Sequence, residues 1–439
     1  MSTDASGGSL SERARRSNPL PEGTFSVGVG LLVNGIGAYA FTVLAARGLG
    51  EEEFSSLAVL WAAVFLAAPG LFLPVEQEVS RTVAARRARG EGASGVIRQA
   101  GLIGAGLAGV VIVATLVSLG WVYDLFFDSQ ALLLTGFLLA LVGYLAAHLA
   151  RGVMAGQGRF DGYSTYFGTE GGLRILVAVV FLVAGVSVAG PYGLAVGLIP
   201  FVAVIVALRG KRGLVVEGAP VRTGEMSASL GALLVGSLLT ALLLNAGPLA
   251  IEILATDEES AEAGRFLAGL MIARVPLFLF QAVQASLLPK LALLAGGHRW
   301  VEFRAALRRL LVAVGGLAVV ATLAAWTIGP AVVRVTFGEA FALGHRDLGL
   351  LALASGIFML AVALGQSLIA LSSPARMAVG WGAGVLVFAG VTAAGDDLYL
   401  RVELGLVAGT ATVAAVLATL VWVRLRDVAT SAGRQGTAD

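Results

Sequence analysis

Three arginines lie inside apolar stretches of the chain, and their type and position suit anion chemistry. Arg265 and Arg274 occur in GRFLAGLMIARVPLFLFQAVQASLLPK, residues 264–290, and Arg174 occurs in a stretch near 166–187. An arginine at bilayer depth costs about 2.5–3.5 kcal/mol on insertion scales, so it should face a protein interior or a wet cavity. Because a guanidinium presents paired donors to phosphate oxygens, all three are candidate substrate-binding residues. The alternatives are a buried ion pair for Arg274 and a contact with lipid headgroups for Arg265.

Amide side chains accompany these arginines. Gln281 lies seven residues after Arg274 and should share its face of a continuous helix, and Gln284 lies close to that face. Three more deep amides complete the candidates for substrate contact, namely Asn34, Asn245 and Gln366. Hydrogen bonding between helices is the alternative for each of them.

Acidic residues near the apolar stretches are candidates for a gate or for ion coupling. Glu170 lies four residues before Arg174, the favourable order for a helical ion pair, so mutual neutralisation and a cavity role both stay open. In PVEQEVSR, residues Glu76, Glu78 and Arg81 are expected at a cytoplasmic mouth, either as an ion-pair gate or as a solvated helix end. The gate or coupling candidates are therefore Glu76, Arg81, Glu170 and Glu252, the last near the outer end of an apolar stretch.

The elements that position these residues are predicted to be transmembrane helices. Of 439 residues, 57% are hydrophobic and 13% are charged, and the mean hydropathy is +0.88. A soluble domain averages about 25% charged residues, and apolar runs long enough to cross a bilayer recur along this whole chain. We predict an all-α polytopic membrane protein with about twelve spans, near 25–45, 55–75, 97–121, 130–150, 166–187, 190–208, 229–253, 265–289, 308–329, 348–371, 376–394 and 402–423.

Charge alternates between the two sets of connections. One set carries most of the 30 basic residues, including those of the linker near 209–222 and of the tail after 423. The opposite set holds the acidic groups Glu51–Glu53, Asp124, Asp128, Asp257–Glu259 and Asp396–Asp397. The positive-inside rule then places both termini in the cytoplasm.

The two halves of the chain look duplicated. LLVNGIGAYAFTVLA (31–45) resembles LLLNAGPLAIEILA (242–255), with Asn34 opposite Asn245, and Pro74 lies opposite Pro289 at a similar offset. An even number of spans separates the copies, which predicts two parallel six-helix lobes related by an axis along the membrane normal. The predicted division is a disordered N-terminus 1–24, an N-lobe 25–208, a basic linker 209–228, a C-lobe 229–423 and a tail 424–439.

Prolines and basic segments follow the same repeat. Proline pairs interrupt the second and eighth predicted spans, where they would kink both helices at matching places. A basic amphipathic segment then follows in each half, near 81–91 and 299–309. Each segment is expected to lie along the cytoplasmic interface.

Catalytic motifs are missing from the sequence. It contains no GxxxxGK[ST], no HExxH and no cysteine, and its three histidines are far apart. The connections are too short for a soluble catalytic domain, so we predict a non-enzyme without a cofactor or metal. A membrane glycosyltransferase or polymerase would place a metal at an acidic outer loop such as Glu51–Glu53 or Asp396–Asp397; a solvated loop is the alternative.

Residues 30–92 resemble the opening of polysaccharide-biosynthesis membrane proteins. The pattern is a span ending in LxARxLG, an acidic residue before Phe, a second span and an SR segment. It is carried here by Leu44, Ala46, Arg47, Gly48, Leu49, Gly50, Glu53, Phe54, Ser80 and Arg81. Such proteins are flippase-like (Wzx-like) members of the multidrug/oligosaccharidyl-lipid/polysaccharide (MOP) exporter superfamily. The resemblance implies a V-shaped, two-lobed transporter with a central cavity in a bacterial plasma membrane.

The same resemblance implies the cargo and the partners. A polyprenyl-(pyro)phosphate-linked oligosaccharide would be flipped from the inner to the outer leaflet by alternating access. The expected partners are this lipid-linked saccharide, the bilayer and polysaccharide synthesis enzymes, and no nucleic acid. The drug-exporting branch usually has an acidic residue deep in an N-lobe helix, where this chain has only Asn34, so coupling to H⁺, to Na⁺ or to the membrane potential alone stays open. The rival interpretations are a cation-coupled small-molecule exporter, the membrane enzyme above, and a scaffold that recruits synthesis enzymes.

Overall fold

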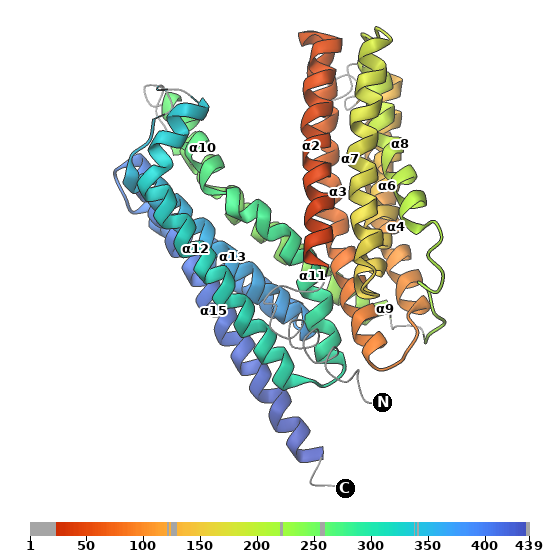
Figure 1. Cartoon of the computed structure of the whole chain (residues 1–439), viewed down its shortest axis with the longest axis vertical. Coiled ribbons are helices and arrows are strands. Elements are labelled where there is room, and N and C mark those ends of the chain that lie inside the picture. The colour runs from red at the N-terminus through yellow and green to blue at the C-terminus, as the bar shows by residue number, and fades with distance from the viewer. Residues whose placement is uncertain are drawn as a thin grey trace, which may run out of the picture.

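The computed structural model describes residues 23–120, 123, 130–219, 223–254, 260–337, 339 and 342–435, and its regular elements are helices (Figure 1). In this part of the chain twelve helices are long and apolar enough to cross a membrane. The prediction of an all-α polytopic chain is confirmed. The helices are α2 (Thr24–Leu49), α3 (Glu51–Ala88), α4 (Ser94–Val117), α6 (Ala131–Gly156), α7 (Phe160–Val183), α8 (Ala189–Leu208), α9 (Thr223–Leu254), α10 (Ser260–Ala273), α11 (Val275–Gly296), α12 (Trp300–Phe337), α13 (His345–Ala370), α14 (Pro374–Ala393) and α15 (Leu398–Gln435).

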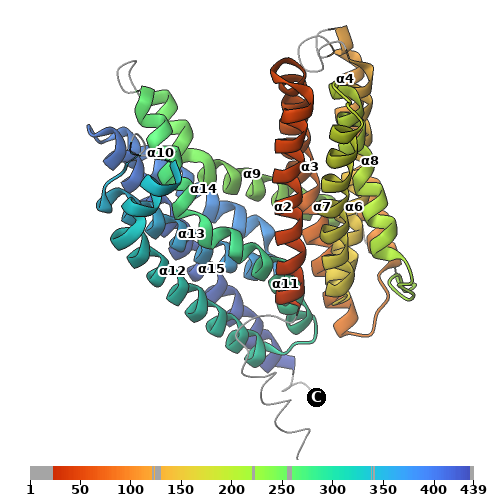
Figure 2. The ribbon, with the colours of Figure 1, turned by 45° about the horizontal axis from the view of Figure 1, so that its top comes forward.

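The helices form two bundles that lie at an angle to each other, so the molecule has the predicted V shape (Figures 1 and 2). Helices α2 to α8 make one lobe, whose core includes Phe41 and Phe72. Helices α9 to α15 make the other lobe, whose core includes Phe303 and Trp381. We call them the N-lobe and the C-lobe. Each lobe has its own apolar core.

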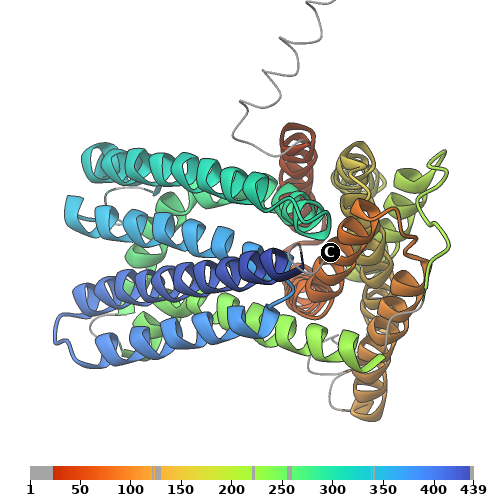
Figure 3. The same ribbon diagram turned by 90° about the horizontal axis from the view of Figure 1, so that it is seen from below.

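The lobes meet at one end, which Figure 3 views from below. There α11 packs against α2 and α3, and α3 also contacts α9. The contact is close, because a Cβ added to Gly296 of α11 would lie 2.5 Å from the carbonyl oxygen of Ala85 in α3. Arg86 and Arg87 follow Ala85 in the last turn of α3, and Arg299 follows Gly296 in the turn after α11. The V is therefore closed at its basic end.

Close packing inside the N-lobe depends on glycine. A Cβ at Gly37 of α2 would lie 2.4 Å from the carbonyl oxygen of Gly171 in α7, and one at Gly136 of α6 would lie 2.3 Å from that of Gly193 in α8. Helices in a bilayer gain little from hydrophobic burial against each other, so small residues that allow backbones to touch contribute much of their association. These contacts hold α6 and α7 in the register that the polar residues below require.

The eighth predicted span, 265–289, is wrong as a single helix. It consists of α10, which ends at Ala273, and α11, which begins at Val275, with Arg274 between them. Pro276 explains the break, because a proline lacks the backbone N–H and its ring clashes with the carbonyl four residues earlier. By contrast, α3 contains Pro69 and Pro74 and remains one helix. A break in the helix is therefore found at Pro276, whereas the kinks expected at matching places in the two halves stay a prediction.

The separate interfacial segments are also wrong. Residues 300–309 are the first turns of the long helix α12, and Phe303 and Leu307 are buried in the C-lobe core. The basic residues 81–88 likewise complete α3. In each case a buried apolar face continues from one span into the basic segment, so burial in the lobe outweighs lying along the interface.

The chain between the lobes lies against the N-lobe. Helix α8 ends at Leu208 and α9 begins at Thr223, earlier than the expected 229. Between them, the Val216 carbonyl accepts hydrogen bonds from the backbone N–H groups of Ala93 and Ser94, both at 3.0 Å. The expected disordered N-terminus lies outside the described residues, apart from Gly23 and Thr24.

Candidate functional site

A buried polar cluster surrounds Glu76 inside the N-lobe. Arg151 donates to Glu76 Oε2 from Nε and Nη2, at 3.0 and 2.6 Å, and the Tyr163 hydroxyl donates to Oε1 at 2.7 Å. His148 Nδ1 lies 2.9 Å from the same carboxylate. All four side chains are buried. The carboxylate is thus neutralised by an arginine within the lobe.

A second cluster surrounds Arg174. Its guanidinium donates to Glu170 Oε1 at 2.7 Å, to the Tyr144 hydroxyl at 2.8 Å and to Asn34 Oδ1 at 2.9 Å. The Tyr144 hydroxyl donates in turn to Glu170 at 2.9 Å. Glu170 and Arg174 are each only 2% exposed. The ion pair predicted from their spacing is confirmed, whereas contact of Arg174 with a substrate stays a prediction.

Helical spacing explains how the two clusters form. On α6, Tyr144, His148 and Arg151 follow at intervals of four and three residues, so one face presents all three to the lobe interior. On α7, Tyr163, Glu170 and Arg174 are likewise spaced by seven and four.

Aromatic rings complete the surroundings of both arginines. Arg151 lies 5.2 Å from the Tyr166 ring centroid and Arg174 lies 5.4 Å from that of Trp61, within the range of cation–π attraction. Two arginines and two glutamates leave these clusters without net charge. Breaking such a buried pair typically costs about 3–5 kcal/mol, so both clusters stabilise the lobe whatever else they do.

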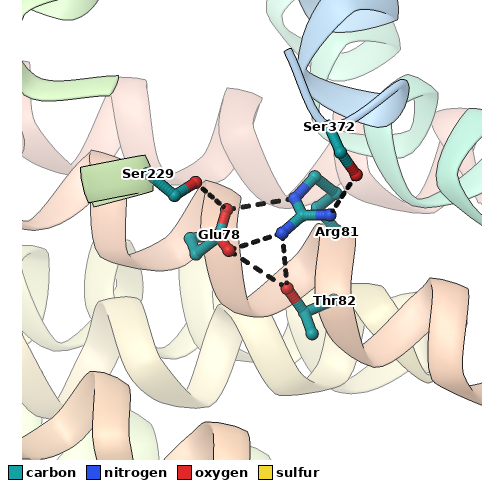
Figure 4. Close-up of polar contacts among 5 residues, drawn as sticks. All are labelled: Glu78, Arg81, Thr82, Ser229 and Ser372. Atoms are coloured by element: carbon teal, nitrogen blue, oxygen red, sulfur yellow. Dashed lines mark hydrogen bonds and ion pairs between the residues drawn. The ribbon is translucent and has the colours of Figure 1, made fainter. Parts of the chain in front are cut away.

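A third polar cluster joins the lobes at their basic ends (Figure 4). Arg81 of α3 donates to Glu78 from Nε at 3.0 Å and to Ser372 Oγ from Nη1 at 2.8 Å. Ser229 of α9 donates to Glu78 Oε2 at 2.9 Å. Ser372 lies in the turn between α13 and α14. One ion pair of the N-lobe therefore contacts two separate elements of the C-lobe.

A fourth contact reinforces this seam. The hydroxyls of Thr24 in α2 and Ser286 in α11 lie 2.8 Å apart. Glu78 and Arg81 therefore lie at a junction of the lobes, as a gate requires.

Glu76 does not lie at this junction, because two residues along a helix turn a side chain to the opposite face. Its expected place at the cytoplasmic mouth is wrong, and it lies in the lobe interior instead.

Arg274 lies in the C-lobe, beside a small hollow that is open to the surroundings. Its side chain is half-buried and donates to the Leu244 carbonyl of α9. Among the described residues, no carboxylate forms an ion pair with it. A guanidinium carries five N–H donors, so most of its hydrogen-bonding capacity is left for another partner. The hollow is otherwise lined by Leu243, Leu270, Leu277, Leu351, Ala354, Phe358 and Leu406, with the hydroxyls of Ser355 and Thr410.

The other predicted residues do not join one site. Gln281 is exposed on α11, while Arg274 faces α9 from the helix break, so their predicted common face is wrong. Asn245 is exposed and donates to the Ala241 carbonyl of its own helix at 2.9 Å. Gln284 and Arg265 are half-buried, and Gln366 is buried. The side chain of Glu252 lies outside the described residues. The substrate-binding candidates are thus divided between the lobes.

Some important residues were not singled out by the sequence. Arg151 was not among the candidate residues, yet it lies within α6 and is 7% exposed. It is a fourth arginine inside a span, and its position one turn after His148 was the available signal. The hydroxyls of Thr24, Ser229, Ser286 and Ser372 gave no signal, because Ser and Thr are frequent at helix contacts in membranes.

Comparisons with known proteins give a fold. No family model matches the chain. An uncharacterised protein of Mycobacterium tuberculosis is 27% identical over 356 residues, 78% of each chain. A second one, found in M. tuberculosis and M. bovis, is 25% identical over 379 residues, 82% of this chain and 84% of the relative.

Solved structures decide the architecture. A crystal structure of MATE in the bent conformation matches with a TM-score of 0.76 at 15% identity, over 93% of this chain and 95% of that one. The chain has the MATE fold. The straight conformation of MATE matches with a TM-score of 0.75 at 16% identity, and a mutant of a Vibrio cholerae MATE transporter with 0.73 at 13%, each over 93% of this chain and 95% and 96% of theirs. Within this MATE fold, the neutral clusters belong to the N-lobe, and Arg274 belongs to the C-lobe.

Proposed function

We propose that the protein carries a polyprenyl-(pyro)phosphate-linked saccharide from the inner to the outer leaflet by alternating access of its lobes. The MATE fold supports the transport part, since the matched structures are of MATE transporters. The choice of cargo rests on the C-lobe hollow.

Arg274 is the observation that carries the cargo assignment. A half-buried guanidinium with unused donors stands beside a wall of leucine and phenylalanine side chains. A lipid phosphate is complementary to this site, because its oxygens accept charge-assisted hydrogen bonds from the guanidinium and its hydrocarbon chain packs against the apolar side chains. A cationic drug would meet an arginine without an acidic partner among the described residues. The hollow therefore favours an anionic amphiphile over the cargo of a cation-coupled drug exporter.

The seam supports the alternating-access part. Hydrogen bonds that join the lobes at the basic end are Arg81 to Ser372, Ser229 to Glu78, and the contact between Thr24 and Ser286, and they accompany the packing of α11 against α2 and α3. Each such bond contributes about 0.5–1.5 kcal/mol, or somewhat more when one group is charged, which is small enough to break in each cycle. The positive-inside rule would place the basic end and both termini in the cytoplasm, and this structure would then correspond to an outward-facing state.

Two acidic residues of the outer connections, Glu53 and Asp397, have structural roles at helix N-termini. Glu53 Oε2 accepts from the backbone N–H of Ala189 at 2.6 Å and from Gln130 at 3.1 Å, so it caps α8. Asp397 Oδ1 accepts from the Leu400 N–H at 2.7 Å at the start of α15. Both carboxylates lie at helix N-termini, where the partial positive charge of the helix dipole stabilises them. Within the described ranges no three His, Cys, Asp or Glu residues are grouped to hold a metal.

Native mass spectrometry of the purified protein tests this proposal. The probe is an undecaprenyl-pyrophosphate-linked saccharide, with undecaprenol as the uncharged comparison. We expect Arg274→Ala to reduce binding of the pyrophosphate probe by about tenfold or more, since a charged hydrogen bond contributes about 1.5–3 kcal/mol. Arg274→Lys should bind the probe with an affinity between those of wild type and Arg274→Ala, because lysine keeps the charge without the planar pair of donors.

Two controls make the result specific. Arg308→Ala removes an exposed arginine at the start of α12 and should leave binding unchanged. Undecaprenol should bind equally to wild type and Arg274→Ala. Equal binding of the pyrophosphate probe by wild type and Arg274→Ala would make Arg274 structural. Failure of wild type to bind it would favour a small-molecule exporter or a scaffold.

A further inference from the structure

One buried glutamate differs from the others. Among the described residues, four glutamates are buried, namely Glu76, Glu78, Glu170 and Glu403. The first three each have an arginine within 3.0 Å. Glu403 of α15 is 0% exposed, and neither of its carboxyl oxygens has a hydrogen-bond partner in the part of the chain that the structure describes.

The surroundings of Glu403 do not neutralise it. The charged groups that act on it are Arg346 and Asp347 of α13 and Asp397 of the turn before α15. Arg346 is already paired with Asp347 at 2.8 Å and is half exposed. Helix α14 contributes no charged residue on its last turn, and the Glu252 side chain of α9 lies outside the described set. An ionised Glu403 would therefore meet two carboxylates and one arginine that is already engaged.

Burial makes the ionised form costly. An unpaired carboxylate taken out of water loses several kcal/mol of solvation, whereas the neutral acid avoids most of this loss. The fold shown here therefore accommodates Glu403 as the neutral acid. A conformation that admits water to the outer end of α15 would let the acid ionise.

Glu403 shares its helix face with the proposed cargo site. Leu406 and Thr410 follow it by three and seven residues, so they lie on the same side of α15, and both line the hollow beside Arg274. Seven residues of helix span about 10 Å, a distance at which charges interact appreciably in a medium of low dielectric constant. An anion in the hollow and a carboxylate at Glu403 would disfavour each other.

From this geometry we propose that Glu403 is a proton-binding site whose protonation favours an anion in the hollow beside Arg274. The carboxyl group exchanges its proton with water, and its ionised form disfavours an anion in the hollow. This inference rests on the proposed transport function, because it adds a pH dependence to the proposed cargo site. Glu403 also replaces Glu76 and Glu170 as the candidate proton-binding residue, because the arginines of those two glutamates already neutralise them.

The first test needs no cargo. Thermal unfolding of the detergent-solubilised protein is measured from about pH 5 to about pH 9, the range in which a perturbed glutamate titrates. Stability from a group that is neutral in the fold is present at acid pH and is lost as the pH rises. We expect the unfolding midpoint of wild type to fall with rising pH. In Glu403→Gln, which mimics the neutral acid, the midpoint should stay near the acid value.

Matched controls and a second readout decide the outcome. Asp396→Asn removes an exposed acid at the same end of the C-lobe and should behave like wild type. A pH dependence that persists in Glu403→Gln, or a midpoint set by Na⁺ instead of pH, would overturn the proposal. If Glu403→Gln does not fold, infrared spectroscopy of wild type tests whether a buried carboxyl group is protonated. A protonated-carboxyl band that disappears with rising pH supports the site, and its absence at every pH overturns it.

The effect on the cargo site is measured as binding of the pyrophosphate-linked saccharide between about pH 5 and about pH 9. The affinity of wild type and of Asp396→Asn should fall as the pH rises, whereas Glu403→Gln should fall less because it cannot ionise. An equal loss of affinity in wild type and Glu403→Gln would overturn the proposal. If wild type does not bind the saccharide at all, the cargo assignment fails, and the titration experiment still decides whether Glu403 binds a proton.

Discussion

Arg81 of α3 donates a hydrogen bond to Ser372 Oγ, 2.8 Å away, across the junction of the two lobes. The same guanidinium forms an ion pair with Glu78 of its own helix, so the N-lobe supplies the charges and the C-lobe supplies the hydroxyls of Ser372 and Ser229. Opening this end breaks the links to these hydroxyls but leaves the ion pair intact. The seam can therefore separate without leaving an unpaired charge behind.

A disulfide should lock the seam. The chain has no cysteine, so Thr24→Cys with Ser286→Cys introduces only one intramolecular pair, at hydroxyl positions 2.8 Å apart. A disulfide requires its two side chains to be this near, and we expect oxidation to form it readily. The oxidised protein should lose transport and regain it on reduction, because the basic end can no longer open.

Each single cysteine variant is the control for the lock and should retain transport under oxidation. Crosslinking can be followed by a change in electrophoretic mobility. Transport that continues at the wild-type rate in fully crosslinked protein would contradict alternating access at this seam.

Removing the Ser372 hydroxyl should loosen the same seam. In the double-cysteine background, Ser372→Ala deletes the link to Arg81, worth about 1–3 kcal/mol for a bond to a charged group, so the closed state is less populated. We expect slower crosslinking between positions 24 and 286. Ser373→Ala is the matched control, since its hydroxyl donates within its own turn, to the Leu371 carbonyl. Equal rates in the two variants would show that Arg81 does not hold the seam.

Glycine packing between α2 and α7 can be tested by a matched pair of substitutions. A Cβ at Gly37 would lie 2.4 Å from the Gly171 carbonyl oxygen, whereas a Cβ at Gly35 would meet nothing within 4 Å. We expect Gly37→Ala to lower the free energy of unfolding by about 1–3 kcal/mol through overpacking. Gly35→Ala should be neutral or stabilising by up to about 1 kcal/mol, from helix propensity. Thermal unfolding in detergent measures both, and equal midpoints would argue against this helix contact.

The cluster around Arg174 should show strong coupling between its members. Arg174→Met leaves Glu170 ionised and buried with only the Tyr144 hydroxyl, so we expect a loss of about 3–5 kcal/mol in stability. Adding Glu170→Gln removes the unpaired charge and should restore part of that loss. A double-mutant cycle on unfolding measures the coupling, which we expect at about 1–3 kcal/mol. Additive effects would show that the two side chains are not paired.

Contacts between side chains that are close in the sequence were the part of the site that the sequence could predict. Glu170 and Arg174 were paired correctly because four residues along a helix bring two side chains together without help from the rest of the chain. Glu76 and Arg151 are 75 residues apart, and no spacing rule connects them. Glu76 and Glu78 look alike in the sequence, but one contacts Arg151 in the lobe interior and the other Arg81 at the seam.

The sequence by itself determined the membrane class and the number of spans, because hydropathy acts on each segment separately. Only the tertiary structure decided that α10 and α11 are separate helices, that Arg274 lies beside an apolar hollow, and that Glu403 is buried without a partner among the described residues. The free energy of a buried charge depends on which side chains surround it, and those neighbours come from distant parts of the chain.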